Sequence, residues 1–514
     1  MMEANATMPE LTILKPQTIT GFSQTLQTFA VATLILSLCS YIPKLRYKAQ
    51  LAKIPIVGDA NMQSMTIKKL YSEGYEKFKD SAFRVVTVDG DDNVIVPARF
   101  LPELRKLPDN VLSNSRNIDS LLEVKYTKVT IGALSAHSLK ADLTPSLPRI
   151  SPIISAEVAT AVKRRLPPCD EWTEVDILSK LVDIVAQVSG CIFVGPVLAQ
   201  DPDYLFCCAN YSTFIMDAVQ EIKSIRPVFR PFLAPRLPVV RRLREMEQRL
   251  MKHLSPIVKE RQEAAKNDPN WQQPDDMLQW LLNRSDEYGT LPVEQLVSVQ
   301  LGLIFGAIHT TSMTATNVLF TLAVMPGDSD LLREEMRHVL AANDNKFTNK
   351  AMQQMEKLDS YMKEVMRLFP LGTSNFGRRV LKGITLSNGQ HIPPGVMIEA
   401  PTLEIYIDPA YYPDSATFDG LRHFKLRSGS KAADARHQFV IANETNLSFG
   451  YGNHACPGRF FATNEIKMIL ARLILDYDIK MPDNGKQERY QPIEFGPFIT
   501  PAPGNMLMFK KVEV

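Results

Sequence analysis

A long apolar run from Pro292 to Met325 constrains the fold more than any other part of this sequence. As a helix, its thirty-four residues would be about 51 Å long, enough to cross a large folded domain. The run does not suit a membrane, because polar side chains interrupt it at Gln300, at 309–312 and at Asn317. We therefore expect one long helix through the centre of the molecule.

The composition limits what this molecule can be. The chain has 514 residues, of which 45% are hydrophobic and 22% charged, as in an ordinary globular protein. A formal net charge of only +2 argues against a nucleic-acid partner. Six cysteines without a CxxC pair are too few for a disulfide scaffold and suit a reducing compartment.

The amino-terminal region carries the pattern of a membrane anchor. Residues 21–42 contain no charged side chain and would form a helix of about 33 Å, enough for a bilayer core. Pro43 ends this run, and four basic residues follow it, at Lys44, Arg46, Lys48 and Lys53. By the positive-inside rule, this places the downstream side in the cytoplasm.

A cleaved signal peptide is the alternative, but a twenty-residue polar lead and the lack of a clear cleavage site disfavour it. We expect a lumenal stub over 1–20, a single-pass transmembrane signal anchor over 21–42 and a basic, proline-containing hinge over 43–58. One domain then follows over 59–514. In this arrangement Asn5, in the sequence Asn5-Ala6-Thr7, would be a lumenal glycosylation site.

Residues 59–514 read as mainly α with small β-sheets, and no internal boundary divides them. The segment 85–97 predicts a β-hairpin, and 377–401 predicts further short strands around an Asn388-Gly389 turn. Helical patterns cover 171–193, 204–225 and 239–265.

The strongest chemical signal is a glycine-rich loop around Cys456. Glycines at 450, 452 and 458 allow a tight backbone passage, and the apolar segment 460–475 predicts a helix directly after the loop. A helix N-terminus favours a thiolate. The alternatives are a buried structural cysteine and a zinc site, although the zinc site lacks two further ligands at sensible spacing.

The pattern F449-x-x-G452-x-H454-x-C456-x-G458 resembles the haem-binding loop of the cytochrome P450 monooxygenases. This resemblance implies a cytochrome P450-like fold and a haem b whose iron is ligated by Cys456. It also implies that Phe449 contacts the cofactor and His454 a haem propionate. Thiolate ligation favours cleavage of the O–O bond.

A second match is the pair Glu364 and Arg367, which lie three residues apart and so share a helical face. Taken alone, it would be a surface ion pair worth about 0–1 kcal/mol. The pair resembles the family's E-x-x-R motif, and Arg422 resembles its third member. The resemblance implies a buried structural network of the three that locks the haem loop.

A third match lies at the centre of the long apolar run. The Thr310 hydroxyl can bond back to the carbonyl of residue 306 and bend the helix, although a polar seam between packed helices is the alternative. The segment resembles the family's oxygen-activation motif, with Thr310 as the hydroxyl that guides protons. An acid usually precedes this threonine, but His309 stands here, and imidazole can relay protons near neutral pH.

Two further cofactor contacts follow from the resemblance. Residues 137–144 resemble the family's haem-contacting helix, with Ala136 at its usual tryptophan position and Lys140 in place of the propionate-binding arginine. A solvated lysine is the alternative. Arg378, in better register than Arg379, would reach the other propionate.

Together these features predict a membrane-anchored haem-thiolate monooxygenase of the endoplasmic reticulum, with its catalytic domain in the cytosol. Its partners would be NADPH-cytochrome P450 reductase, with cytochrome b5 as a second candidate donor, and a lipophilic small molecule. Sequence style resembles fungal members that act on secondary metabolites such as terpenoids. The predicted pocket lining comprises Phe214, Phe305, Ala307, His309, residues 371–376 and Ile499.

Two other functions remain open at this point. One is a haem-thiolate isomerase or dehydratase that needs no reductase, and the other is a non-catalytic haem-binding sensor or carrier. Neither would need Thr310 to deliver protons.

Overall fold

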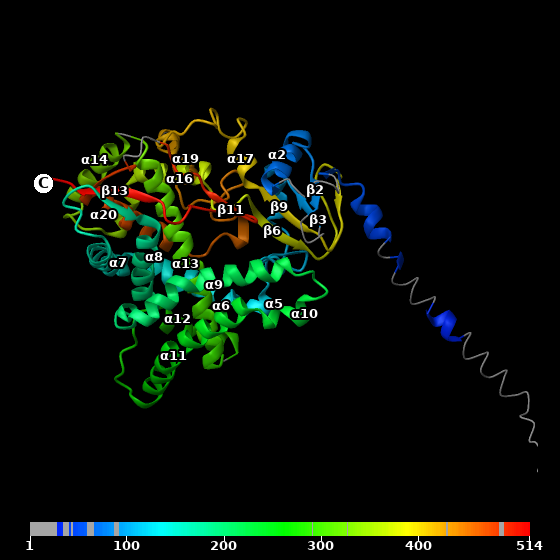
Figure 1. Ribbon diagram of the computed structural model, residues 1–514, viewed down its shortest axis with the longest axis horizontal. Helices are drawn as coiled ribbons and strands as arrows, with labels where there is room; N and C mark the ends of the chain where they lie inside the picture. The colour runs from blue at the N-terminus through cyan, green and yellow to red at the C-terminus, as the bar shows by residue number, and fades with distance from the viewer. Residues whose placement is uncertain are drawn as a thin grey trace, which may run out of the picture.

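The computed structural model describes residues 28–33, 41–42, 45–58, 66–86, 92–289, 291–325, 327–427, 430–482 and 488–513. Helices make up most of the body, and the largest sheet lies on the right of the view beside helix α2, Ile67–Lys77 (Figure 1). The expected mainly helical fold with small sheets is confirmed. The predicted stub, 1–20, and most of the predicted anchor, 21–42, lie outside the described residues.

The long central helix is α13, Val293–Leu322, which has 30 residues. Pro292 stands at its N-cap, where a missing N–H costs nothing. It packs against α8 (Ile177–Val194), α9 (Pro202–Ser224), α16 (Glu356–Leu368) and α20 (Arg459–Asp476). Among the described residues, α8 and α13 are long and apolar enough to span a membrane, but most of each is buried inside the protein. They are core helices.

The remaining elements complete the body. The other helices are α3 Leu101–Leu104, α4 Asn114–Leu121, α5 Val124–Thr127, α6 Ala133–Ser138, α7 Thr144–Arg165, α10 Arg230–Leu233, α11 Pro238–Asn267, α12 Met277–Arg284, α14 Asp328–Ala341, α15 Asn349–Gln354, α17 Thr402–Ile407, α18 Arg422–Arg427 and α19 Lys431–His437. The strands are β1 Ile56–Val57, β2 Phe83–Val86, β3 Asp92–Ile95, β4 Leu112–Ser113, β5 Thr173–Asp176, β6 Ser374–Val380, β7 Ile384–Thr385, β8 His391–Ile392, β9 Met397–Pro401, β10 Tyr477–Lys480, β11 Ile493–Phe495, β12 Phe498–Thr500 and β13 Met506–Lys511.

The main sheet has the strand order β1-β2-β3-β9-β6-β4. The predicted hairpin is present as β2 and β3, which pair antiparallel with Phe83 opposite Ile95. Strand β9 then adds parallel to β3, and β6 pairs antiparallel with β9. Of the short strands expected over 377–401, β6 and β9 therefore extend a sheet that begins near the amino terminus, whereas β7 and β8 pair with each other in a separate two-stranded sheet.

The helix expected over 171–193 is wrong in its first residues. Residues 173–176 form β5, which pairs antiparallel with β13 at the other end of the chain. The helix α8 begins only at Ile177, where Asp176 caps it by accepting a hydrogen bond from the Ser179 amide at 3.2 Å. Strand pairing across more than 300 residues overrides the local helical pattern.

Candidate active site

The glycine-rich loop presents Cys456 just before α20. Its backbone N–H donates to the Phe449 carbonyl at 2.7 Å, which closes the loop on itself. Gly450 and Gly452 have φ angles of +74° and +75°, which a side chain would strain. A Cβ at Gly452 would also meet the Arg105 Cβ at 2.8 Å. The loop therefore needs glycine at both positions.

The surroundings of the Cys456 sulfur fit a metal-bound thiolate. Burial raises the pKa of the thiol, while hydrogen bonds from the Gly458 and Arg459 amides and the Arg459 charge act in the opposite direction. Amides aimed at a sulfur stabilise negative charge there, and coordination to a cation would deprotonate the thiol. The donor set at this loop thus fits the iron of a haem.

Helix α13 places Thr310 as the sequence suggests. Its Oγ1 donates to the Gly306 carbonyl at 2.8 Å. Both residues are exposed although they lie in the middle of a largely buried helix, and a Cβ at Gly306 would meet no atom within 4 Å. Open space therefore borders the helix beside the Thr310 hydroxyl.

His309 points toward helix α9. Its Nε2 lies 3.4 Å from Thr213 Oγ1, and its buried Nδ1 has no hydrogen-bond partner among the described residues. Burial lowers the pKa of His309 to about 4, so the imidazole is neutral near pH 7. A neutral imidazole with one open nitrogen can exchange a proton only if a further group reaches Nδ1, so its role as a relay stays a prediction.

The structure brings Glu364, Arg367 and Arg422 together. Arg367 binds the Glu364 carboxylate through two hydrogen bonds of 2.9 and 2.7 Å, and Arg422 Nε adds a third at 3.0 Å. The Glu364 and Arg367 side chains are 0% and 2% exposed. Arg367 also donates to the carbonyls of Tyr406 and Ser415, so the network ties α16 to the segment leading toward the haem loop.

The three predicted propionate contacts differ in their surroundings. Arg378 is buried, stacks 4.4 Å from the Phe376 ring centre and has no carboxylate partner among the described residues. Burial lowers its pKa to about 10 and the Asp109 charge offsets this only in part, so an anionic ligand would stabilise the buried guanidinium. His454 Nε2 instead lies 2.5 Å from Asp109 Oδ1. Lys140 is exposed and makes no ion pair within the described part of the chain.

The comparisons with known proteins agree with this geometry. The family model described as Cytochrome P450 matches residues 135–509. The chain belongs to the cytochrome P450 family. It is 39% identical over 500 residues to cytochrome P450 monooxygenase TES1 of Alternaria alternata, covering 95% of this chain and 94% of that protein.

Two further relatives are also cytochrome P450 monooxygenases. ATR3 of Stachybotrys chlorohalonatus is 36% identical over 82% of this chain and 89% of its own length, and braC of Annulohypoxylon truncatum is 31% identical over 89% and 93%. A retinoic acid-bound cyanobacterial CYP120A1 matches the fold with a TM-score of 0.66 and 18% identity, over 89% of this chain and 95% of that one. This P450 is therefore a monooxygenase, and its family implies a haem-thiolate cofactor.

The segments predicted to line the pocket of this P450 meet in pairs. The Ile499 amide donates to the Leu371 carbonyl at 3.0 Å, and the Thr373 amide to the Pro497 carbonyl at 2.9 Å. A second pair consists of α9 and α13, where Ser212 Oγ donates to the Phe305 carbonyl at 3.3 Å.

Two residues at the site of this P450 carry no signal in the sequence. Asp109, the partner of His454, lies 345 residues before it, and Thr213 reaches His309 from a different helix. Neither belongs to a motif, and a single carboxylate or hydroxyl in a polar segment is ordinarily solvated. Only the folded chain places them next to the predicted residues.

Proposed function

We propose that this P450 oxidises an unactivated C–H bond of a lipophilic small molecule, a secondary metabolite such as a terpenoid. The observation that carries the proposal is the exposed pair Gly306 and Thr310, which borders open space in the middle of the largely buried helix α13. Phe214, Phe305 and Leu371 are partly buried and pack against the main apolar core. Apolar walls with few polar groups favour a lipophilic ligand. The relatives' names identify no substrate class, so this assignment rests on the site.

In the proposed mechanism, residues of this chain hold the cofactor and donate a proton. Cys456 would ligate the iron, and Arg378 would pair with a propionate. When bound, the haem supplies activation of dioxygen with electrons from NADPH. Thr310 can release its hydroxyl from the Gly306 carbonyl and offer it as a proton donor beside the open space. The apolar segments around it exclude water from the reacting carbon.

Product analysis tests this reaction. The full-length enzyme in membranes with its reductase and NADPH is incubated with candidate terpenoid scaffolds, and products are identified by mass. We expect an increase of one oxygen atom, dependent on both NADPH and reductase. Conversion without reductase would instead support the isomerase or dehydratase. Ligand-induced spectral shifts without any turnover would support the sensor.

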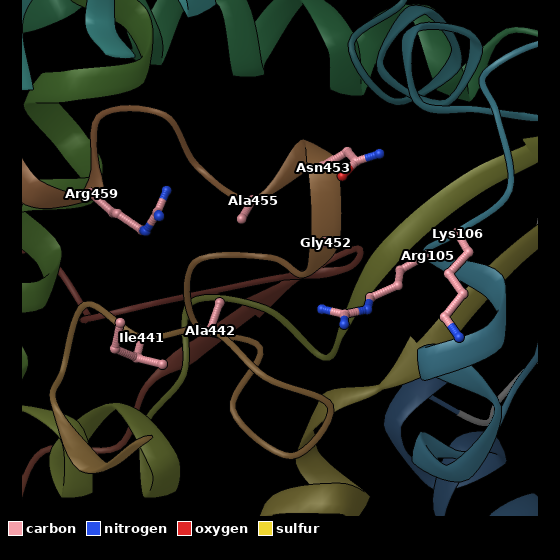
Figure 2. A pocket seen from close by; sticks show the side chains of 8 residues that line it. All are labelled: Arg105, Lys106, Ile441, Ala442, Gly452, Asn453, Ala455 and Arg459. Carbon is pink, nitrogen blue, oxygen red and sulfur yellow. The ribbon is translucent and has the colours of Figure 1, made fainter. Parts of the chain in front are cut away.

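For electron supply, we propose that NADPH-cytochrome P450 reductase, or cytochrome b5, docks beside the cysteine loop. A hollow of about 460 Å³ lies there, and Figure 2 shows Arg105, Lys106 and Arg459 around it. Its lining contains these three cations and no carboxylate. A basic surface next to the iron-binding loop is complementary to an acidic electron donor.

Charge reversal at this hollow separates docking from chemistry. Arg105→Glu with Lys106→Glu should raise the KM for reductase about tenfold at low salt, and less at high salt, because exposed charges act mainly on association. Peroxide-driven turnover, which needs no reductase, is the control and should not change. An unchanged KM would show that the donor binds elsewhere.

We also propose that residues 21–42 form a single-pass anchor in the endoplasmic reticulum membrane, with residues 59–514 in the cytosol. The support is the uncharged run and the basic residues after it. Residues 45–51 are helical and lead directly into β1 of the main sheet. Deleting residues 1–42 should move the enzyme from the membrane pellet to the supernatant. Asn5→Gln should remove a glycosidase-sensitive mass shift from the full-length protein.

A further inference from the structure

A second buried ionic cluster lies on α16, about one turn before Glu364. Its centre is Asp359, which is 3% exposed. Asp359 Oδ1 lies 2.6 Å from the Lys467 ammonium of α20, and Oδ2 binds the Arg427 guanidinium of α18. The same Oδ2 accepts a hydrogen bond of 2.7 Å from the Phe439 amide. One carboxylate of α16 therefore binds three segments that lie far from α16 in the sequence.

On the amino-terminal side of the Cys456 loop, a continuous set of contacts leads from Asp359 to the cysteine. The Phe439 ring packs edge-on against the Phe449 ring, with centroids 5.1 Å apart and planes at 70°. The Phe449 carbonyl accepts the Cys456 amide at 2.7 Å. A displacement of Phe439 would therefore be transmitted to the backbone that presents the sulfur.

On the carboxy-terminal side of the Cys456 loop, Asp359 forms an ion pair with α20, the helix that follows the loop. Lys467 lies about two turns after the start of α20, and its ammonium also donates to the Met352 and Met355 carbonyls at 2.9 and 3.3 Å. Lys363, one turn after Asp359, donates to the carbonyls of Arg436 and Gln438 just before Phe439. One face of α16 thus fixes the chain on both sides of Cys456.

We propose that Asp359 is a positioning residue for the cysteine thiolate. It has a different set of partners from the Glu364 network, whose hydrogen bonds reach residues 406–422, although Arg422 and Arg427 both lie on α18. The inference rests on Cys456 as the iron ligand. The cluster keeps the Asp359 carboxylate ionised. Burial opposes its ionisation, but the charges of Lys467 and Arg427 outweigh burial and keep the pKa of Asp359 below the ordinary value.

The test compares two Asp→Asn substitutions in the holoenzyme. Asp359→Asn removes the charge that holds both flanks. Asp276→Asn is the matched control, because Asp276 is also 3% exposed and pairs with an arginine, Arg261, while its side-chain hydrogen bonds among the described residues go to Arg261 and the Gln279 amide and not to the loop. The measurement is the rate at which the thiolate-specific carbon monoxide band is lost on mild warming, with the urea midpoint of each protein measured separately.

We expect Asp359→Asn to lose the band about tenfold faster than the wild type, and Asp276→Asn to stay within about twofold at a comparable urea midpoint. Hydrogen exchange should accelerate in peptides that contain the Phe439 and Cys456 amides. Equal rates of band loss in the two variants would overturn the proposal, because the effect would then be one of general stability.

Phe439→Leu decides the question if Asp359→Asn fails to incorporate haem. This substitution leaves every ion pair in place but removes the ring contact with Phe449 and part of the core packing, since Phe439 is 1% exposed. We therefore expect faster band loss together with a modest fall in the urea midpoint. An unaltered rate would overturn the proposal. If Cys456 were not the ligand, Cys456→Ala would retain the band or the wild type would lack it, and the two failures are therefore distinguishable.

Discussion

Behind the cysteine loop, charged groups are buried and closely paired, whereas along α13 polar groups keep open hydrogen-bonding capacity. The Glu364 carboxylate accepts from Arg367, Arg422 and the Asp419 amide. In contrast, His309 Nδ1 and Thr311 Oγ1 are buried without a partner among the described residues. Both regions lie in the same helical core.

The difference reflects two tasks. A closely paired ionic network favours one geometry, since any departure leaves an unpaired charge in a poorly solvating interior. That suits a sulfur that must stay fixed. A proton donor must instead exchange partners, and a group bound to a weak local acceptor, as Thr310 is to a helix carbonyl, can do so.

The largest effect should come from the sulfur that the rigid region presents. Cys456→Ala should abolish both the red-shifted carbon monoxide band and NADPH-dependent oxidation, since no thiolate remains to ligate iron. Cys191→Ala is the control, because Cys191 is a buried cysteine of α8 away from the loop. It should keep both signals. Retention of the band in Cys456→Ala would assign the ligand to another residue.

The next effect should come from the network itself. Glu364→Gln leaves two arginines, 2% and 11% exposed, without their counter-ion, and we expect a loss of about 3–5 kcal/mol in unfolding free energy. The exposed pair Lys68 and Glu494 provides the control, where Glu494→Gln should cost about 0–1 kcal/mol. Urea unfolding of the holoenzymes measures both. Similar losses would mean that the buried network is no more important than a surface pair.

Features with a local pattern could be predicted from the sequence. The α13 helix, the β2–β3 hairpin and the helix after Cys456 each depend on the periodicity or turn residues of one segment. The Glu364–Arg367 pair is similar, because a spacing of three on a helix places both side chains on one face.

What could not be predicted depends on pairs that the fold brings together. Strand β5 exists because β13 pairs with it, and His454 has Asp109 beside it, 345 residues away in the sequence. Asp359 and Lys467 lie in separate, ordinary helical patterns, so neither signals a buried ion pair. One sequence holds no record of such distant partners.

A smaller effect is expected along α13, where polar groups keep open hydrogen-bonding capacity. Thr310→Ala should retain haem and ligand binding but divert reducing equivalents to peroxide, lowering product formed per NADPH about tenfold, because a positioned proton donor is lost. Thr314→Ala is the matched control. Its hydroxyl makes the same 2.8 Å bond to the carbonyl four residues earlier, but it is 5% exposed. Equal coupling in the two variants would refute the role of Thr310.

The smallest effect should reveal the charge state of His309. Burial lowers its folded-state pKa to about 4 from 6.5, so between these values the unfolded chain binds a proton that the native protein does not. Stability contributed by the neutral imidazole is therefore present above pH 6.5 and is lost as the pH falls toward 4.

Between pH 7 and pH 5.5 the wild type should lose about 1 kcal/mol more than His309→Asn in urea unfolding. Parallel pH profiles for wild type and His309→Asn would mean that His309 has the same pKa in the folded and the unfolded chain, so that burial does not hold the imidazole neutral.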